Sequence, residues 1–197
     1  MSTSTGAEVD RRHSATDGGN VTTIAAITAG CAFMAESVVS LVIDSHVGYH
    51  ALNVVLNAAL LVVAVSVARA GRARVGAAGV VGGWGTAAMA LLAGAGGLWT
   101  LLAEGLASSE TPGVVDGIAH TAVMASILFM VPVGIGLRRS SSIAGTVIAV
   151  AAACIVAMIL GDLDAPEVFL VPEAALGAGW VLYGRSMRTQ PAATQRL

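Results

Sequence analysis

The chain contains no lysine and has little charge of any kind. All ten basic residues are arginine, and charged residues make up 11% of the 197 positions, against about 25% in a typical soluble domain. Without lysine there is no Schiff-base chemistry, which excludes retinal and pyridoxal proteins. No GxxxxGK[ST] motif is present either, so nucleotide-driven transport within this chain is not expected.

Cysteine is also scarce, with only Cys31 and Cys154 in the whole chain. Both lie inside apolar stretches and neither belongs to a CxxC motif. A disulfide framework or a redox motif is therefore not supported. We predict that both are free thiols, buried as small hydrophobic side chains.

Charge this sparse cannot cover a water-exposed surface, and hydrophobic residues make up 56% of the chain. They form six long blocks, at about 22–44, 48–70, 75–103, 114–137, 142–163 and 166–184. Each block is close to the roughly 20 helical residues that cross a hydrocarbon core of about 30 Å. Backbone groups in lipid must be satisfied within the segment, which favours helices. The sequence therefore predicts an all-α integral membrane protein, a bundle of six transmembrane helices.

The loops predict the domain boundaries and the orientation of the chain. We expect a disordered tail over 1–20, the six-helix domain over 21–185 and a second tail over 186–197. The arginines lie before the first span, in the second and fourth connections, and after the sixth span: Arg11, Arg12, Arg69, Arg72, Arg74, Arg138, Arg139, Arg185, Arg188 and Arg196. With six spans, all these segments share one face, which the positive-inside rule makes cytoplasmic. Both termini should then be cytoplasmic, in a multi-pass protein of a bacterial inner or plasma membrane.

Polar residues form a stripe on one face of the second span. His46, His50, Asn53 and Asn57 are spaced four, three and four, which is the spacing of one helix face. Amides that deep in hydrocarbon are costly unless they are paired. We therefore expect this stripe to face the inside of the bundle.

Matching polar positions occur in four other spans. The first has Glu36, Ser40 and Asp44, the fourth Asp116 and His120, the fifth Asp162, and the sixth Glu173 directly after Pro172. Each set is most polar at its outer end. The simplest arrangement is a funnel open to the outside, floored by Glu36, Glu173, Asn53 and Asn57 and lined further by Ser40 and Asp162.

The sequence leaves three functional readings open. The first is a cation site in which His46 and His50, four residues apart, bind a divalent metal that Asp44, Asp116 and His120 complete. A haem held by His50 and His120 is a variant of this reading. The same groups could instead relay protons and couple a gradient to transport or sensing.

The second reading is an acid-catalysed enzyme of cyclase or isomerase type. Glu36 and Glu173 lie deep enough to be held protonated, and each could act as general acid on a lipophilic, isoprenoid-like substrate. The third reading is an accessory or immunity-type subunit without chemistry. Expected partners are the lipid bilayer and a small cation or lipophilic molecule, with no nucleic acid. Both homo-oligomers and hetero-oligomers stay open.

Two packing features complete the expectations. The third span carries Gly79 and Gly83 in GxxxG spacing, which favours close helix packing, and we expect this helix near the bundle centre. The aromatic residues are expected as two belts at the membrane interfaces. The inner belt contains Trp84, Trp180 and Tyr183, and the outer belt contains Tyr49, Trp99 and Phe169.

Overall fold

The computed structural model describes residues 4–42, 46–107, 109–161 and 166–189, and within these ranges all regular secondary structure is helical. The helices are α1 (Ser4–Val42), α2 (His46–Arg69), α3 (Gly71–Thr100), α4 (Gly113–Leu137), α5 (Ser142–Leu160) and α6 (Pro166–Thr189). A single π-helical segment, η1 (Leu101–Leu106), extends α3. The predicted all-α membrane bundle of six long helices is confirmed.

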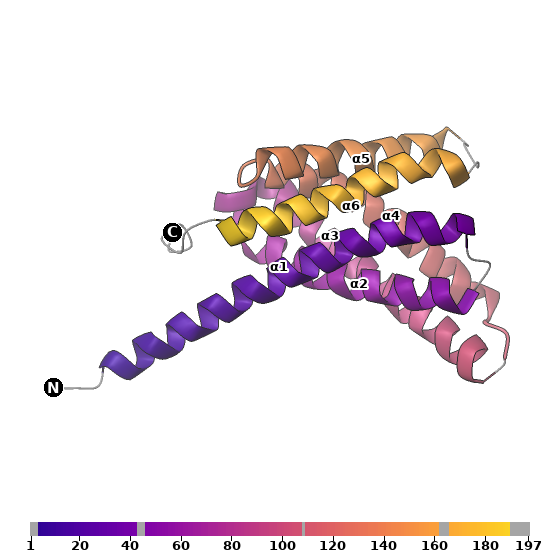
Figure 1. Cartoon of the computed structure of the whole chain (residues 1–197), viewed down its shortest axis with the longest axis horizontal. Helices are drawn as coiled ribbons and strands as arrows, with labels where there is room; N and C mark the ends of the chain where they lie inside the picture. Colours follow the sequence, from indigo (N-terminus) through magenta and orange to yellow (C-terminus); the bar gives the residue numbers. More distant parts are fainter. Residues whose placement is uncertain (1–3, 43–45, 108, 162–165, 190–197) are drawn as a thin grey trace.

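Five described helices are long and apolar enough to cross a membrane. Their spans are Gly19–Val39, Gly48–Arg69, Gly71–Leu106, Gly113–Leu137 and Ser142–Leu160. The sixth helix, α6, lies alongside α1 and α5 within the same bundle (Figure 1).

The helices form a closed ring. Each of α1 to α5 packs against the next helix along the chain, and α6 packs against α1. The predicted position of the third span near the bundle centre is therefore wrong. Helix α3 is one member of the ring, packed between α2 and α4, and it exposes Trp84 and Leu91 on its outer side.

Small residues allow the close approach between neighbouring helices. Gly30 of α1 and Gly177 of α6 lie so close that a Cβ on Gly30 would overlap the Gly177 carbonyl oxygen. The two glycines of the predicted GxxxG pair pack against two different helices. Gly79 faces Gly136 of α4, whereas Gly83 faces Ala64 and Ala68 of α2.

Helix α1 begins well before its membrane span. It is helical from Ser4, and its first turns project away from the bundle beyond the other helices (Figure 1). The domain boundaries expected from the sequence, with a disordered tail over 1–20, stay a prediction.

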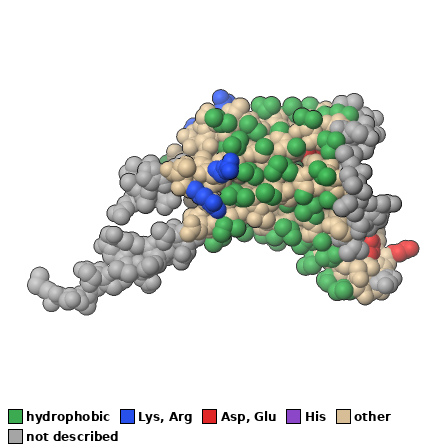
Figure 2. Space-filling model, in the orientation of Figure 1, with side chains coloured by type: hydrophobic (Ala, Val, Ile, Leu, Met, Phe, Trp, Pro, Cys, Tyr) green, Lys and Arg blue, Asp and Glu red, His purple; other side chains and the backbone are tan. Residues whose placement is uncertain are grey.

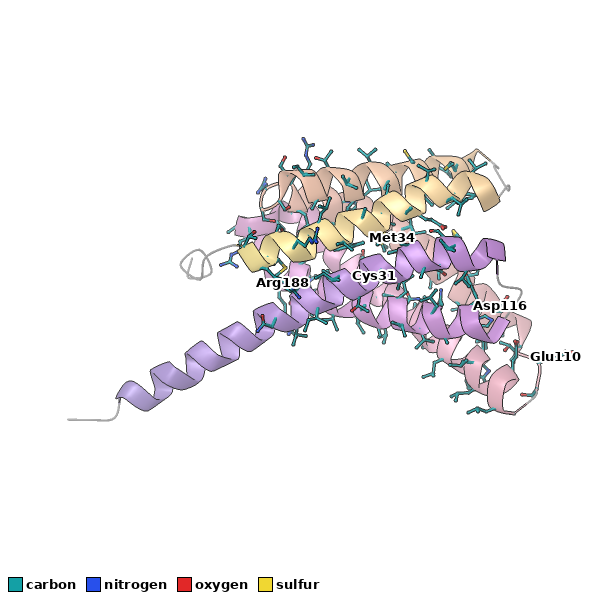
Figure 3. All side chains as sticks on the ribbon, in the orientation of Figure 1. Cys31, Met34, Glu110, Asp116 and Arg188 are labelled. Carbon is teal, nitrogen blue, oxygen red and sulfur yellow. The ribbon has the colours of Figure 1, made fainter. Side chains whose placement is uncertain are left out.

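Charge is separated along the bundle. Arg69, Arg138 and Arg188 lie at or just beyond helix ends at one end of the bundle, and Glu110 and Asp116 lie near the start of α4 at the opposite end. Figure 2 shows the blue and red side chains at opposite ends, and the labelled Arg188 and Glu110 in Figure 3 mark these two ends. We call them the arginine end and the acidic end.

Candidate functional site

Polar side chains of α1, α2 and α6 come together toward the acidic end of the bundle. They are Glu36, Ser37, Tyr49, Asn53, Asn57 and Glu173, and we call them the carboxyl cluster. Four of these six, Glu36, Glu173, Asn53 and Asn57, are the predicted floor of the funnel. Their convergence from three helices supports the expectation that costly polar groups in a membrane protein face one another rather than lipid.

Glu36 is the centre of the cluster on α1. The Asn53 amide donates to its Oε1 at 3.4 Å, and Tyr49, one turn earlier in α2, lies close to the same carboxyl. Glu173 lies near enough for its charge to act on Glu36. Two carboxyl groups, from the first and last helices, thus share one half-buried site.

Glu173 is held by Ser37, the residue after Glu36. The Ser37 hydroxyl lies 3.1 Å from Oε2 of Glu173 and 2.9 Å from the Phe33 carbonyl oxygen one turn earlier in α1. Ser37 is buried. Helix α6 reaches this position because Gly177, one turn beyond Glu173, fits directly against Gly30 of α1.

Asn53 and Asn57 form a hydrogen-bonded pair that extends from Glu36 toward the arginine end, and we call this pair the asparagine ladder. The Asn57 amide donates to both the backbone oxygen and the Oδ1 of Asn53, each at 2.9 Å. Both asparagines are buried, and α3 has glycines opposite them. A Cβ at Gly97 would lie 3.2 Å from Asn53 Oδ1, and one at Gly94 would lie 3.3 Å from Asn57 Cβ. The ladder fixes which way the Asn53 amide points, so that its NH₂ group faces Glu36.

The predicted metal ligands are distributed differently. His50 is half-buried one turn outward of Asn53 and contacts the Tyr49 ring edge-on, with ring centroids 5.6 Å apart. Asp116 and His120 are exposed on α4, and Figure 3 labels Asp116 near the acidic end. Asp44, Asp162 and the side chains of Ser40 and His46 lie outside the described residues.

Within the described ranges, no three His, Cys, Asp or Glu side chains come together to hold a metal ion. Because Asp44 and the His46 side chain are not among them, the metal assignment to Asp44, His46, His50, Asp116 and His120 stays a prediction.

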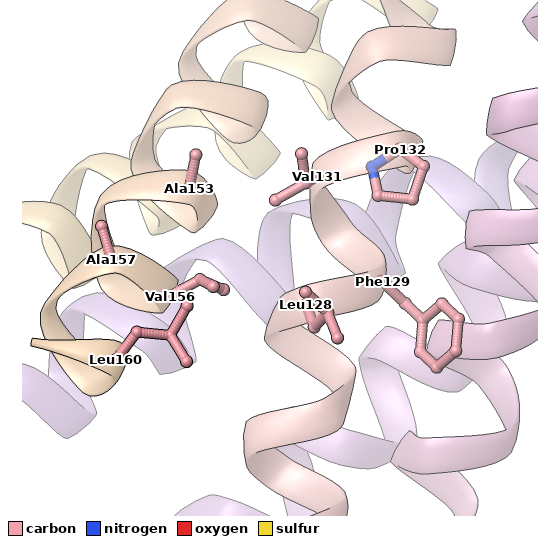
Figure 4. A pocket seen from close by; sticks show the side chains of 8 residues that line it. All are labelled: Leu128, Phe129, Val131, Pro132, Ala153, Val156, Ala157 and Leu160. Carbon is pink, nitrogen blue, oxygen red and sulfur yellow. The ribbon is translucent and has the colours of Figure 1, made fainter.

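Two apolar grooves lie on the outer side of the ring. One, of about 500 Å³, is lined by α4 and α5 residues including Phe129 and Pro132 (Figure 4). The other, of about 380 Å³, lies between α5 and α6 and includes Cys154 and Pro172. Neither groove is lined by a member of the carboxyl cluster.

Four residues lie in environments that differ from the sequence prediction or were absent from it. Cys31 and Cys154 are free but exposed on the helix surface, so the prediction that they are buried is wrong. Trp180 is fully buried rather than part of an interfacial belt. Ser37 was missed because it falls outside the four-residue spacing of Glu36, Ser40 and Asp44, and its position next to a deep glutamate was the only available signal.

Comparisons of the chain with known protein families, with curated proteins and with solved structures found no match. The fold defines the class of the protein as a helical membrane bundle. What it does must be argued from the carboxyl cluster.

Proposed function

We propose that the protein binds a proton at the Glu36 and Glu173 carboxyl pair and that this binding is linked to transport or sensing across the membrane. The observation that carries the proposal is the pairing itself. Two acidic side chains from different helices share one half-buried site, and no arginine of the described residues reaches either of them. Two like charges so placed repel, and a bound proton removes the repulsion.

The hydrogen bonds of Ser37 fit a protonated Glu173. The single hydroxyl proton of Ser37 faces two acceptors, the Phe33 carbonyl at 2.9 Å and the Glu173 carboxyl at 3.1 Å. One hydroxyl has one donor and two acceptor lone pairs. If Glu173 carries a proton, it donates to Ser37, and Ser37 donates to Phe33. Every group then has a partner.

The surroundings of Glu36 favour a proton over a metal ion. Asn53 presents its NH₂ group to the carboxyl, and an NH₂ group cannot ligate a metal. The Asn53 Oδ1 is already used as acceptor by Asn57. The cluster therefore offers donors to its carboxyl groups, which suits a site that cycles between carboxylate and carboxylic acid.

The position of the pair connects the site to the packing of the ring. Glu36 belongs to α1 and Glu173 to α6, the two helices that close the ring. A change of charge at this contact between α1 and α6 changes how the two carboxyl groups interact. They repel when both are ionised, and one can donate a hydrogen bond when it is protonated. Local protonation can bias a helix interface between two arrangements in this way, which is what proton-linked transport or sensing needs.

Infrared difference spectroscopy of the purified protein in lipid tests the proposal. A pH step should produce a protonated-carboxyl band in the wild type, and Glu36→Gln and Glu173→Gln should each diminish or remove it. Glu110→Gln is the matched control, because Glu110 is exposed in the connection between α3 and α4, and it should leave the band intact. A band that persists unchanged in both cluster variants would contradict the proposal.

The groove between α5 and α6 favours one second candidate, the acid-catalysed enzyme. It is apolar, and its lining includes Val171 and Pro172, the two residues before Glu173. A lipophilic substrate in this groove would lie on the lipid side of α6, whereas Glu173 bonds to α1. This candidate requires product formation that Glu173→Gln abolishes, and the infrared band alone does not establish it.

A further inference from the structure

One face of α6 points into the ring along its whole length. Gly177 and Gly184 of α6 contact α1, and Gly179 contacts α5. At 100° per residue, Glu173, Leu176, Trp180 and Tyr183 fall between these two contact directions. Leu176 and Trp180 are both fully buried. From Glu173 to Trp180 the helix advances about 10 Å toward the arginine end.

Thr86 points into the ring from the opposite side. Gly82 of α3 packs against Phe129 and Val133 of α4, and Gly83 packs against α2. Thr86 is one turn further along and projects between these two directions, toward the ring interior. Helices α3 and α6 are three steps apart in the ring. Thr86 is fully buried.

Thr86 and Trp180 lie at nearly the same depth. The Thr22 hydroxyl contacts the Ser66 hydroxyl at 2.9 Å, and Gly184 packs against Thr23. These contacts place Thr22, Ser66 and Gly184 at one level along the bundle. Gly83 of α3 lies at the same level, because it packs against Ala64 and Ala68 on either side of Ser66.

From this common layer, Thr86 is three residues and Trp180 four residues toward the acidic end. These offsets correspond to heights of about 4.5 and 6 Å. The two side chains therefore face the ring interior at heights that differ by only about 2 Å.

Both side chains lack a hydrogen-bond partner. Thr86 Oγ1 and Trp180 Nε1 are buried and have no hydrogen-bond partner among the residues that the structure describes. Buried polar groups are almost always satisfied, and water fills this role where protein atoms do not. Two unpaired polar atoms at nearly the same depth of the ring make this layer a candidate water site.

The same face of α6 continues to the arginine end. The Tyr183 ring contacts the Trp180 ring edge-on, with centroids 6.1 Å apart. Tyr183 also lies within electrostatic range of Arg74, near the start of α3. Polar atoms thus occur at three levels of the interior, at the carboxyl cluster, at Thr86 with Trp180, and at Tyr183.

We propose that water held by Thr86 and Trp180 forms the inner part of a proton path that joins the carboxyl cluster to the arginine end of the ring. This inference rests on the proposed proton binding and adds its route. A proton enters from the acidic end and protonates one carboxylate of the pair. It passes to water and across the Thr86 hydroxyl, and it leaves to bulk water. Each cycle restores the carboxylate and moves one positive charge across the membrane.

Leu176 closes this path in the described structure. It lies between Glu173 and Trp180 on the inward face of α6, and Leu60 and Met130 are buried in the same core. An apolar constriction between two wet regions blocks conduction until water enters it. The resting protein should therefore conduct protons slowly, and a polar residue at position 176 should open the path.

Proton flux into liposomes containing the purified protein and a pH-sensitive dye, driven by a potassium diffusion potential, tests the route. Leu176→Ser should raise the flux about tenfold, equivalent to about 1.4 kcal/mol on the barrier. Thr86→Val keeps the side-chain shape but loses the hydroxyl, so adding it to Leu176→Ser should remove the gain in proton flux. Adding Thr86→Ser to Leu176→Ser, which keeps a hydroxyl, should leave the gain in place. Leu182→Ser, on the exposed side of α6, is the control for the leucine replacement.

The outcomes distinguish a failure of the proposed proton path from a failure of proton binding at Glu36 and Glu173. If Leu176→Ser leaves the flux at the level of empty liposomes, or if Thr86→Val does not reduce it, the route is wrong. A persisting infrared band of Glu36 and Glu173 would then show that proton binding itself stands. If the band is absent from the wild type as well, both proposals fail together.

Discussion

The hydroxyl of Ser37 and the carboxyl of Glu173 lie 3.1 Å apart although 136 positions separate them in the chain. This contact joins the first helix of the ring to the last. The glycine contact of Gly30 with Gly177 brings the two backbones together, and the polar contact is made one to two turns further toward the acidic end. Closure of the ring and assembly of the carboxyl cluster therefore depend on the same helix pair.

Replacing Ser37 with alanine should weaken this pair. The change removes the partner of Glu173 and leaves the carboxyl half-buried without a hydrogen bond. Hydrogen bonds between membrane helices contribute about 0.6 kcal/mol on average and up to about 1.7 kcal/mol. We expect a loss in the upper part of this range, measured as the free energy of unfolding in mixed micelles.

Thr121→Ala is the matched control for that measurement. The Thr121 hydroxyl is exposed and bonds only to the carbonyl of Gly117 in its own helix. Its removal should change the free energy of unfolding by less than about 0.5 kcal/mol. Equal losses in Ser37→Ala and Thr121→Ala would mean that the contact between α1 and α6 adds nothing.

Gly177→Ala tests the close approach of the two helices. An added Cβ would lie 2.5 Å from the Gly30 carbonyl oxygen, a backbone atom that cannot move aside alone. Overpacking of this kind costs typically 1–3 kcal/mol. We expect a loss of that size in the free energy of unfolding, together with weaker proton binding at Glu173, because α6 is pushed away from Ser37.

Gly117→Ala is the control for the glycine replacement. A Cβ at Gly117 of α4 would meet nothing within 4 Å. Alanine is preferred to glycine in a helix by about 1 kcal/mol, so this variant should be as stable as the wild type or more stable. If Gly177→Ala behaves in the same way, the glycine contact is not what closes the ring.

The sequence predicts the helices well because their signals are local. Long apolar blocks bounded by arginine, glycine or proline give the six helices, and most observed ends agree with the expected ones to within a few residues. The order of packing is not local. Closure of α6 onto α1 depends on Gly30 and Gly177, which the sequence does not distinguish among its 24 glycines.

The candidate site was predictable to the extent that it follows helical spacing. Glu36, Asn53, Asn57 and Glu173 were expected together because polar groups at that depth have to face inward. Tyr49 was assigned to an aromatic belt, although it also lies close to the Glu36 carboxyl. Trp180 was assigned to a belt because distance from a helix end does not tell which face of the helix a residue occupies.

The orientation of the chain yields a labelling prediction. In a background in which Cys31 and Cys154 are alanine, Ser109→Cys places a thiol at the acidic end and Ala73→Cys places one at the arginine end, both at exposed positions. The positive-inside rule puts the arginine end in the cytoplasm. A membrane-impermeant maleimide should therefore label position 109 in intact cells and position 73 only after permeabilisation. The reverse pattern would turn the carboxyl cluster toward the cytoplasm.

Asn53 and Glu36 should be energetically coupled, since the amide of one donates to the carboxyl of the other at 3.4 Å. In a double-mutant cycle of Asn53→Ala and Glu36→Gln, the combined loss of unfolding free energy should differ from the sum of the single losses by roughly 0.5–1 kcal/mol. Asn53→Ala with Thr121→Ala is the comparison cycle. Thr121 bonds within α4, so that cycle should be additive within about 0.3–0.5 kcal/mol. Additivity in the first cycle would mean that Asn53 does not hold Glu36, and the orienting role of the asparagine ladder would be lost with it.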